Sequence, residues 1–154
     1  MLKTDFRLRQ ATIADITILR EFEQGVVEAE RPFSANLRDG KAEYYNLEKL
    51  IKDRDSCLMV AEINDKLAAC GYARIERNKT YLRPSRFGYF GFMYVAPDHR
   101  GRGLITKIME SLTAWCDEQG VSAYKLDVYA ANESAVKAYE KFGFKVNMLE
   151  MWKS

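Results

Sequence analysis

The stretch from Arg86 to Gly120 constrains the fold more than any other part of this chain. It begins with the aromatic, strand-like run RFGYFGFMYV, passes through the turn APDHRGRG, and continues into a helical pattern that ends before Gly120. The apolar residues of that pattern are Leu104, Ile105, Ile108, Met109, Leu112 and Trp115. A strand that leads through glycines directly into an amphipathic helix indicates an α/β protein.

The glycines at this junction predict a ligand site. Gly101 and Gly103 flank Arg102, and residues without a β-carbon let backbone N–H groups converge on one point. The helix that begins at Leu104 adds unpaired amides and the positive end of its dipole, so a phosphate or pyrophosphate would fit. The same spacing is also typical of a tight connection. The P-loop and Rossmann patterns are both incomplete here.

The rest of the chain alternates between strand and helix signals. We expect strands at FRLR, at CLMVAEI and KLAACGYARIE joined as a hairpin by Asn64 and Asp65, at AYKLDVYA, and finally at FKVNMLEMWK. Helices are expected after Thr12, after Asn46, and between Asn132 and Gly143, while residues 30–40 read as a loop.

Composition bounds the class of protein. The 154 residues are 47% hydrophobic and 30% charged, as expected for one globular domain over residues 1–154. A net charge of +2 gives no case for a nucleic-acid partner, and no apolar run suits a signal peptide or a membrane span. Cys57, Cys70 and Cys116 lack metal-ligand spacing and fit buried thiols. We therefore expect a cytoplasmic protein without a metal.

Two motifs resemble those of the Gcn5-related N-acetyltransferase superfamily. RGRGLI, from Arg100 to Ile105, is similar to the Arg/Gln-x-x-Gly-x-Gly/Ala motif, although Ile105 stands where the family usually has Gly or Ala. The second motif is complete as Asn132, Ala135, Tyr139, Gly143 and Phe144. The resemblance is strong from about Tyr89 to Phe144. It implies a single-domain α/β fold in which a mixed, mostly antiparallel sheet is flanked by helices.

The resemblance also implies acetyl-CoA as cosubstrate and gives each matching position a role. The strand residues Met93, Tyr94 and Val95 would pair with the pantetheine arm, and Asn132 would contact the pantetheine side. The backbone amides that would hold the pyrophosphate belong to Arg100, Gly101, Arg102, Gly103, Leu104, Ile105 and Thr106. Tyr139 would lie near the thioester sulfur as general acid, because a phenol of pKa near 10 is protonated at neutral pH. Its helical stripe alone would fit a core aromatic.

The sequence does not identify the group that takes a proton from the amine. Many relatives have a Glu on the strand before the glycine turn, but GYFGFMYV contains no carboxylate. The candidates are Tyr89 acting through water, Glu28, Glu30 and Glu62, each of which also fits an ordinary surface or substrate-contacting position. His99, the only histidine, lies in the phosphate turn and is expected to be a solvated loop residue.

The acceptor side is predicted near the end of the first helix. Candidate substrate-binding residues are Glu30, Arg31, Phe33 and Tyr89, with Tyr44, Tyr45 and Tyr72 as further aromatic walls or core residues. Glu30 and Arg31 would suit an acceptor with an amine and a carboxylate, and would equally fit an ion pair within a surface loop.

We predict acetyl-CoA-dependent N-acetylation of a primary amine on a small molecule. The alternatives are a non-catalytic acyl-CoA-binding or sensing domain, a protein N-acetyltransferase, and a nucleotide-phosphate-binding module. The sequence leaves a homodimer open.

Overall fold

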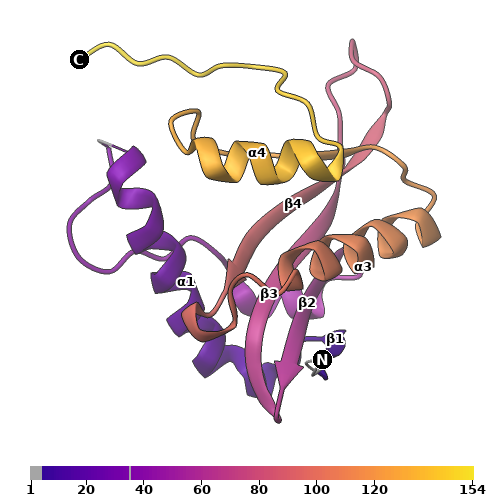
Figure 1. Ribbon diagram of the computed structural model, residues 1–154. Coiled ribbons are helices and arrows are strands. Elements are labelled where there is room, and N and C mark those ends of the chain that lie inside the picture. The colour runs from indigo at the N-terminus through magenta and orange to yellow at the C-terminus, as the bar shows by residue number, and fades with distance from the viewer. Residues whose placement is uncertain (1–4, 35) are drawn as a thin grey trace.

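The computed structural model describes residues 5–34 and 36–154 and builds them around one five-stranded sheet (Figure 1). The strands are β1 (Arg7–Gln10), β2 (Ser56–Ile63), β3 (Lys66–Arg77), β4 (Arg86–Val95) and β5 (Tyr124–Leu126). They lie in chain order, and all neighbours are antiparallel except β4 and β5, which are parallel. The mixed, mostly antiparallel sheet expected from the sequence is confirmed.

Helices cover both faces of the sheet. They are α1 (Ile16–Glu30), α2 (Leu47–Lys52), α3 (Leu104–Glu118) and α4 (Glu133–Phe142). One core joins α1 and α2 to the sheet and includes Leu19, Phe22, Leu47, Leu58, Val60, Tyr72 and Phe92. The other joins α3 to the opposite face and includes Cys57, Ala61, Phe90, Ile108, Met109, Leu112 and Cys116. Successive residues of β2 serve opposite cores, because side chains alternate across a strand.

The local signals read from the sequence are confirmed at most element ends. The side chains of Asn46 and Asn132 accept hydrogen bonds from the first turns of α2 and α4. Asn64 and Asp65 both have positive φ, as a two-residue hairpin turn between β2 and β3 requires. The β5 strand, however, covers only three residues of the predicted run AYKLDVYA.

The predicted final strand, FKVNMLEMWK, is wrong. Residues 144–154 form neither helix nor strand, and their segment runs past α4 and away from the sheet (Figure 1). Its large apolar side chains, at positions 146, 148, 149, 151 and 152, are 63% to 89% exposed. The composition is strand-like, but a strand also needs a neighbour for its backbone, and the segment leaves the sheet without one.

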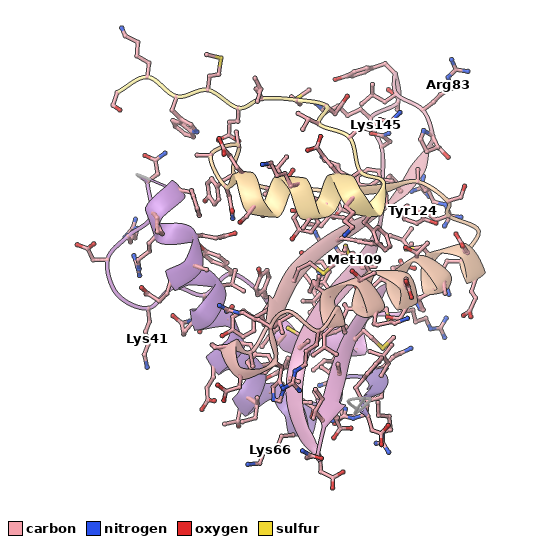
Figure 2. The ribbon with its side chains drawn as sticks, in the orientation of Figure 1. Lys41, Lys66, Arg83, Met109, Tyr124 and Lys145 are labelled. Carbon is pink, nitrogen blue, oxygen red and sulfur yellow. The ribbon has the colours of Figure 1, made fainter. Side chains whose placement is uncertain are left out.

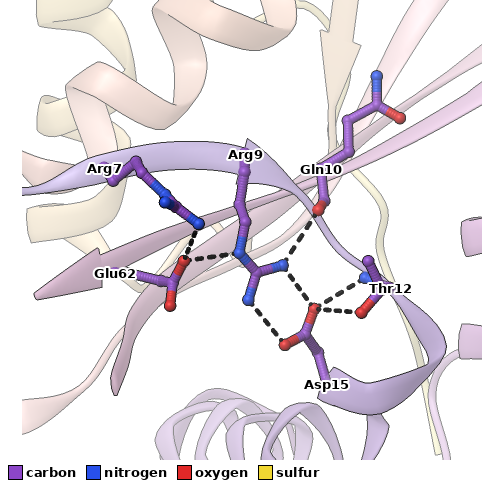
Figure 3. Close-up of polar contacts among 6 residues, drawn as sticks. All are labelled: Arg7, Arg9, Gln10, Thr12, Asp15 and Glu62. Carbon is purple, nitrogen blue, oxygen red and sulfur yellow. Dashed lines mark hydrogen bonds and ion pairs between the residues drawn. The ribbon is translucent and has the colours of Figure 1, made fainter. Parts of the chain in front are cut away.

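A polar cluster joins β1, β2 and the start of α1 (Figure 3). The Arg9 guanidinium donates to Glu62 through Nε at 2.6 Å, and to Asp15 through Nη1 and Nη2 at 2.8 and 2.9 Å. Asp15 also accepts from the Thr12 backbone N–H at 2.7 Å, which completes the capping box ahead of α1. Glu62 is thus held in ion pairs on the β1–β2 side, which favours a structural role for it over that of a catalytic base.

Replacing Asp15 with asparagine is expected to lower the free energy of unfolding at pH 7 by about 1.5–3 kcal/mol, the contribution of hydrogen bonds to charged groups. The Arg9 guanidinium holds the pKa of Asp15 below its usual value, so this stabilisation is present above the unfolded-state pKa. It is lost as the pH falls through the lower folded-state pKa. Urea unfolding of both proteins at pH 7 and at lower pH should therefore show a shrinking difference. A difference that is constant with pH would contradict this account.

Candidate active site

The two parallel strands of the sheet separate soon after they pair. β4 pairs with β5 only over three positions, Gly88 with Tyr124, Tyr89 with Lys125 and Phe90 with Leu126. From Gly91 onward, the only strand paired with β4 within residues 5–34 and 36–154 is β3. Main-chain N–H and C=O groups on the open side of β4 can therefore bind an extended ligand as a further strand would.

A bulge in β4 lies next to this separation. Cys70 of β3 is opposite Tyr94, whereas Tyr72 is opposite Gly91, so β4 contains one extra residue at this point. Phe92 has a φ of 54° and buries its ring in the core beneath α1. Because a bulge bends its strand, the last part of β4 diverges from β5.

A cavity of about 290 Å³ lies between α1, the end of β4, α3 and α4. Its lining includes residues from the two predicted motifs, which are far apart in the sequence, together with the end of β4. The predicted site residues among them are Met93, Tyr94, Val95, Arg100, Ile105 and Tyr139. Arg100 is fixed at the cavity, because its Nε donates to the Val95 carbonyl at 3.0 Å.

The glycine turn next to the cavity has the geometry of an anion cradle. Gly101 and Gly103 have φ of 78° and 76°, and a β-carbon added at either would meet no atom within 4 Å. Gly103 is the N-cap of α3 and offers no side chain to its first amides. The backbone conformation therefore requires glycine, and the space above it is open for a phosphate. Ile105, which departs from the family motif, packs partly against the α3 core and lines the cavity.

Comparison with known proteins decides the family. Residues 21–144 match the family described as Acetyltransferase (GNAT) family. The chain belongs to this family. The superfamily expected from the two motifs is thus confirmed, and acetyl-CoA is the cosubstrate of this family.

Individual relatives agree with this assignment. Human N-acetyltransferase 8 is 30% identical over 95 residues, which are 62% of this chain but only 41% of that protein. A predicted acetyltransferase from Clostridium acetobutylicum, solved with acetyl-CoA, has a TM-score of 0.73, 20% identity and 96% coverage of both chains. Glucosamine-6-phosphate N-acetyltransferase from Arabidopsis thaliana has a TM-score of 0.68 and 23% identity, with 97% and 98% coverage. The two solved structures share the GNAT fold over almost the whole chain.

The residues that the structure describes contain no metal-binding cluster and no membrane-spanning helix. No cluster of three or more His, Cys, Asp or Glu side chains suited to a metal occurs within the described residues. None of the helices described is long and apolar enough to cross a membrane. His99 was expected to be solvated, but its side chain is partly covered and its Nδ1 is buried.

Glu30 is the last residue of α1 and directly follows Ala29, which lines the cavity. Glu30 is half-buried and is not itself among the lining residues. Burial raises the pKa of its carboxyl group. Its charge in turn raises the pKa of Tyr139, which burial has already raised. A carboxylate and a protonated phenol therefore lie in one partly desolvated region of the GNAT chain.

Glu23 fixes the segment that precedes α2, and sequence reasoning missed it. Its side chain is fully buried, and Oε2 accepts hydrogen bonds from the backbone N–H groups of Tyr44 and Tyr45, each at 2.9 Å. Arg20 donates to the other oxygen at 3.2 Å. The signal in the sequence was a charged residue within the apolar stripe of α1. Glu23 thus holds the segment before α2 against α1.

The side chain of Arg31 makes its hydrogen bonds within the loop after α1 and the last turn of that helix. Arg31 donates to Glu28 at 2.9 Å, to the Arg38 carbonyl at 2.6 Å, and to the Gly40 carbonyl. Neither Arg31 nor Phe33 is among the residues that line the cavity. The guanidinium contacts favour a role in closing the loop, which was the alternative left open by the sequence.

Tyr89 lies on β4, the strand whose last residues line the cavity, and its hydroxyl has a carboxylate partner. Its hydroxyl donates to Asp127 Oδ2 at 3.0 Å, just beyond the end of β5. The Arg74 guanidinium lies 5.6 Å from the ring centroids of both Tyr72 and Tyr89. Asp127 was not singled out from the sequence, because its meeting with Tyr89 depends on the pairing of β4 with β5.

Proposed function

We propose that this GNAT chain transfers the acetyl group of acetyl-CoA to a primary amine of a small molecule. The observation that carries the proposal is that the open end of β4 and Tyr139 line one cavity, and that Arg100 and Ile105 bring the glycine turn next to it. One structural neighbour is named for acetylating an amino sugar phosphate, which supports a small acceptor over a long peptide.

The residues around the cavity fit acetyl-CoA. Met93, Tyr94 and Val95 would bind its pantetheine arm along the open edge of β4, and Asn132 would contact it from the start of α4. The amides of residues 100–106 would hold the pyrophosphate at the N-terminus of α3. When bound, acetyl-CoA supplies an activated acyl carbon and a thiolate leaving group. A cytoplasmic location stays a prediction.

Glu30 and Tyr139 would then act as proton acceptor and proton donor. Glu30 would attract the acceptor's ammonium group and take a proton from its nitrogen, since an alkyl amine of pKa near 10.4 is protonated at neutral pH. Tyr139 Oη would donate a proton to the departing sulfur. A backbone N–H of the segment from Met93 to Val95 would polarise the acyl oxygen.

Replacing Gly103 with valine is expected to weaken acetyl-CoA binding roughly 10-fold to 100-fold, the contribution of hydrogen bonds to a charged group. Valine would disfavour the φ of 76° that directs the amides and would occupy the open space above the turn. Isothermal titration calorimetry measures the effect. Gly120→Val is the matched control, because Gly120 has the same φ of 76° at the other end of α3. If Gly103→Val bound acetyl-CoA as tightly as Gly120→Val, the turn would serve only to connect β4 to α3.

An acetyl-transfer screen tests the function. Wild-type protein and acetyl-CoA are incubated with amino acids, polyamines, aminoglycosides or peptides, and release of free thiol is followed. We expect at least one small amine to accelerate thiol release. Turnover with peptides alone would indicate a protein N-acetyltransferase. Tight acetyl-CoA binding without turnover would favour a binding or sensing domain, and equal affinity for ATP a nucleotide-phosphate module.

A further inference from the structure

Four tyrosine rings form a row on the side of the sheet that faces α1 and α2. Its members are Tyr44 and Tyr45 before α2, Tyr72 on β3 and Tyr89 on β4. Successive ring centroids in this order lie 5.7, 5.9 and 6.3 Å apart. All of these side chains except that of Tyr72 are only partly buried. The row, here named the tyrosine wall, therefore keeps part of its surface available to a ligand.

The tyrosine wall has a carboxylate at each end. Burial raises the pKa of the Tyr44 phenol, and the charge of Glu30, which lies nearby, raises it further. At the other end, the Tyr89 hydroxyl donates to Asp127 Oδ2 at 3.0 Å. Within residues 5–34 and 36–154, neither Glu30 nor Asp127 forms an ion pair. Two unpaired carboxylates along one partly exposed surface favour a ligand with positive charge.

The cations near the tyrosine wall have other contacts. The Arg74 guanidinium lies 5.6 Å from the centroids of two rings of the wall, but it donates to Glu76 Oε2 through Nε at 2.9 Å and Nη2 at 2.6 Å. The Lys125 ammonium group lies 5.6 Å from the ring centroid of Phe87. Arg31 is bound within the loop after α1 and the last turn of that helix. Because Arg74 and Glu76 cancel, the wall has an excess of negative charge, which would repel a carboxylate of the acceptor.

Asp127 lies where the two parallel strands separate. It directly follows Leu126, which makes the last pair between β4 and β5 with Phe90. Asp127 is therefore next in register to Gly91, which is two residues before Met93 on the cavity wall. Two residues of a strand span about 7 Å. A short alkyl chain can thus connect a group at the cavity with a group at Asp127.

The hydroxyl of Tyr44 is an independent indication of a polar ligand. Tyr44 Oη is buried, and no group in the described part of the chain completes a hydrogen bond with it. Buried polar groups in folded proteins usually have a partner. An ammonium group that approaches Glu30 can also donate to this oxygen, so one ligand would satisfy both side chains.

We propose that the acceptor is a small molecule with two ammonium groups, and that Asp127 determines this specificity. One nitrogen reacts beside Glu30 and Tyr139, while the second stays charged and pairs with Asp127. The alkyl chain between them packs on the tyrosine wall, whose aromatic faces attract cations. The inference rests on the proposed function, because it names the acceptor of that reaction. Acetylation turns one ammonium group into a neutral amide, so the product keeps only one of the two ion pairs and binds less tightly.

The first test compares diamines with monoamines of the same length. Thiol release from acetyl-CoA is followed with diaminobutane and diaminohexane, each with terminal amines, and with butylamine and hexylamine. In wild-type protein, kcat/KM of at least one diamine should exceed that of its monoamine roughly 10-fold to 100-fold, the contribution of a hydrogen bond to a charged group. Asp127→Asn should bring this ratio close to that expected from the number of amines, mainly through KM. Asp127→Glu, which keeps the charge, should restore part of it.

Asp117→Asn is the matched control for this test. Asp117 also accepts a hydrogen bond from a tyrosine, Tyr124 at 2.6 Å, and Figure 2 shows Tyr124 beside α3, on the opposite side of the molecule from α1. This variant should keep the wild-type ratio of diamine to monoamine. If wild-type protein does not prefer diamines, or if Asp127→Asn and Asp117→Asn lose the preference equally, the proposal is wrong, even where monoamines are acetylated and the proposed function stands.

The second test measures binding without turnover. Diaminohexane and hexylamine are titrated by calorimetry into the protein saturated with CoA. The diamine should bind roughly 10-fold to 100-fold more tightly in wild type, and about as weakly as hexylamine in Asp127→Asn. This result without thiol release in the first test would contradict the proposed function and leave the second ammonium site in place. A preference for amino acids over diamines that is lost in Arg74→Gln would mean that the wall binds a carboxylate through Arg74, and would overturn the proposal.

Discussion

Replacing Tyr139 with phenylalanine is expected to lower kcat on the order of 10²-fold, the lower end of the effect of a positioned proton donor. The affinity for acetyl-CoA should change far less, because the ring stays packed against Phe144, whose centroid lies 6.2 Å away. Burial and the charge of Glu30 raise the pKa of Tyr139, so the wild-type phenol is protonated at neutral pH. The variant keeps the ring and loses only the proton.

The pH dependence of this variant separates catalysis from packing. A thiolate has an intrinsic pKa near 8.5, so departure without an acid is slow but measurable, and the residual rate should rise with pH as the free amine increases. Tyr124→Phe is the matched control, because the Tyr124 hydroxyl donates to Asp117 at 2.6 Å, away from the residues that line the cavity. If kcat of Tyr139→Phe equalled that of wild type at every pH, Tyr139 would be a core aromatic without a catalytic role.

Replacing Glu30 with glutamine is expected to lower kcat/KM for the amine by a similar factor, on the order of 10²-fold. The variant loses both the attraction for an ammonium group and the proton acceptor. Because burial raises the pKa of Glu30, the wild-type kcat/KM should rise with pH through a value above that of an ordinary glutamate. The variant should lack this rise and gain activity only toward the pKa of the amine. Steady-state kinetics across pH on an acceptor from the screen measures both effects.

Two other substitutions make the Glu30 result specific. Glu28→Gln removes a neighbouring carboxylate that is exposed and bound to Arg31, and should leave the acceptor kinetics near wild type. Tyr89→Phe removes the phenol that donates to Asp127 and should also have a small effect. If Tyr89→Phe rather than Glu30→Gln abolishes the pH-dependent rise, the proton leaves through Tyr89 and Asp127 instead.

Much of the site could be predicted because its signals are local. The glycines at 101 and 103, the caps at Asn46 and Asn132, and the strand from Arg86 to Val95 each depend on residues within one or two turns of the chain. Their backbone conformations follow from side-chain chemistry alone. The motifs then placed Tyr139 and the end of β4 together, and the structure brings both to one cavity.

The remaining features depend on contacts between distant segments. The sequence analysis did not single out Glu23, because its two backbone donors come from Tyr44 and Tyr45, about 20 residues further along the chain. Asp127 meets Tyr89 through strand pairing. The segment after Phe144 has a strand-like composition, but composition alone does not determine whether a segment finds a strand to pair with.

The most direct test of the central claim is the balance between thiol and product. Wild-type protein, acetyl-CoA and the best small amine from the screen are incubated, and free thiol and N-acetylated amine are quantified by mass spectrometry. We predict equal amounts of the two, formed at a rate that falls about 10²-fold in Tyr139→Phe. Thiol without acetylated amine, or acetyl-CoA bound and left intact in the presence of every amine, would contradict the assignment of this cavity as an acetyl-transfer site.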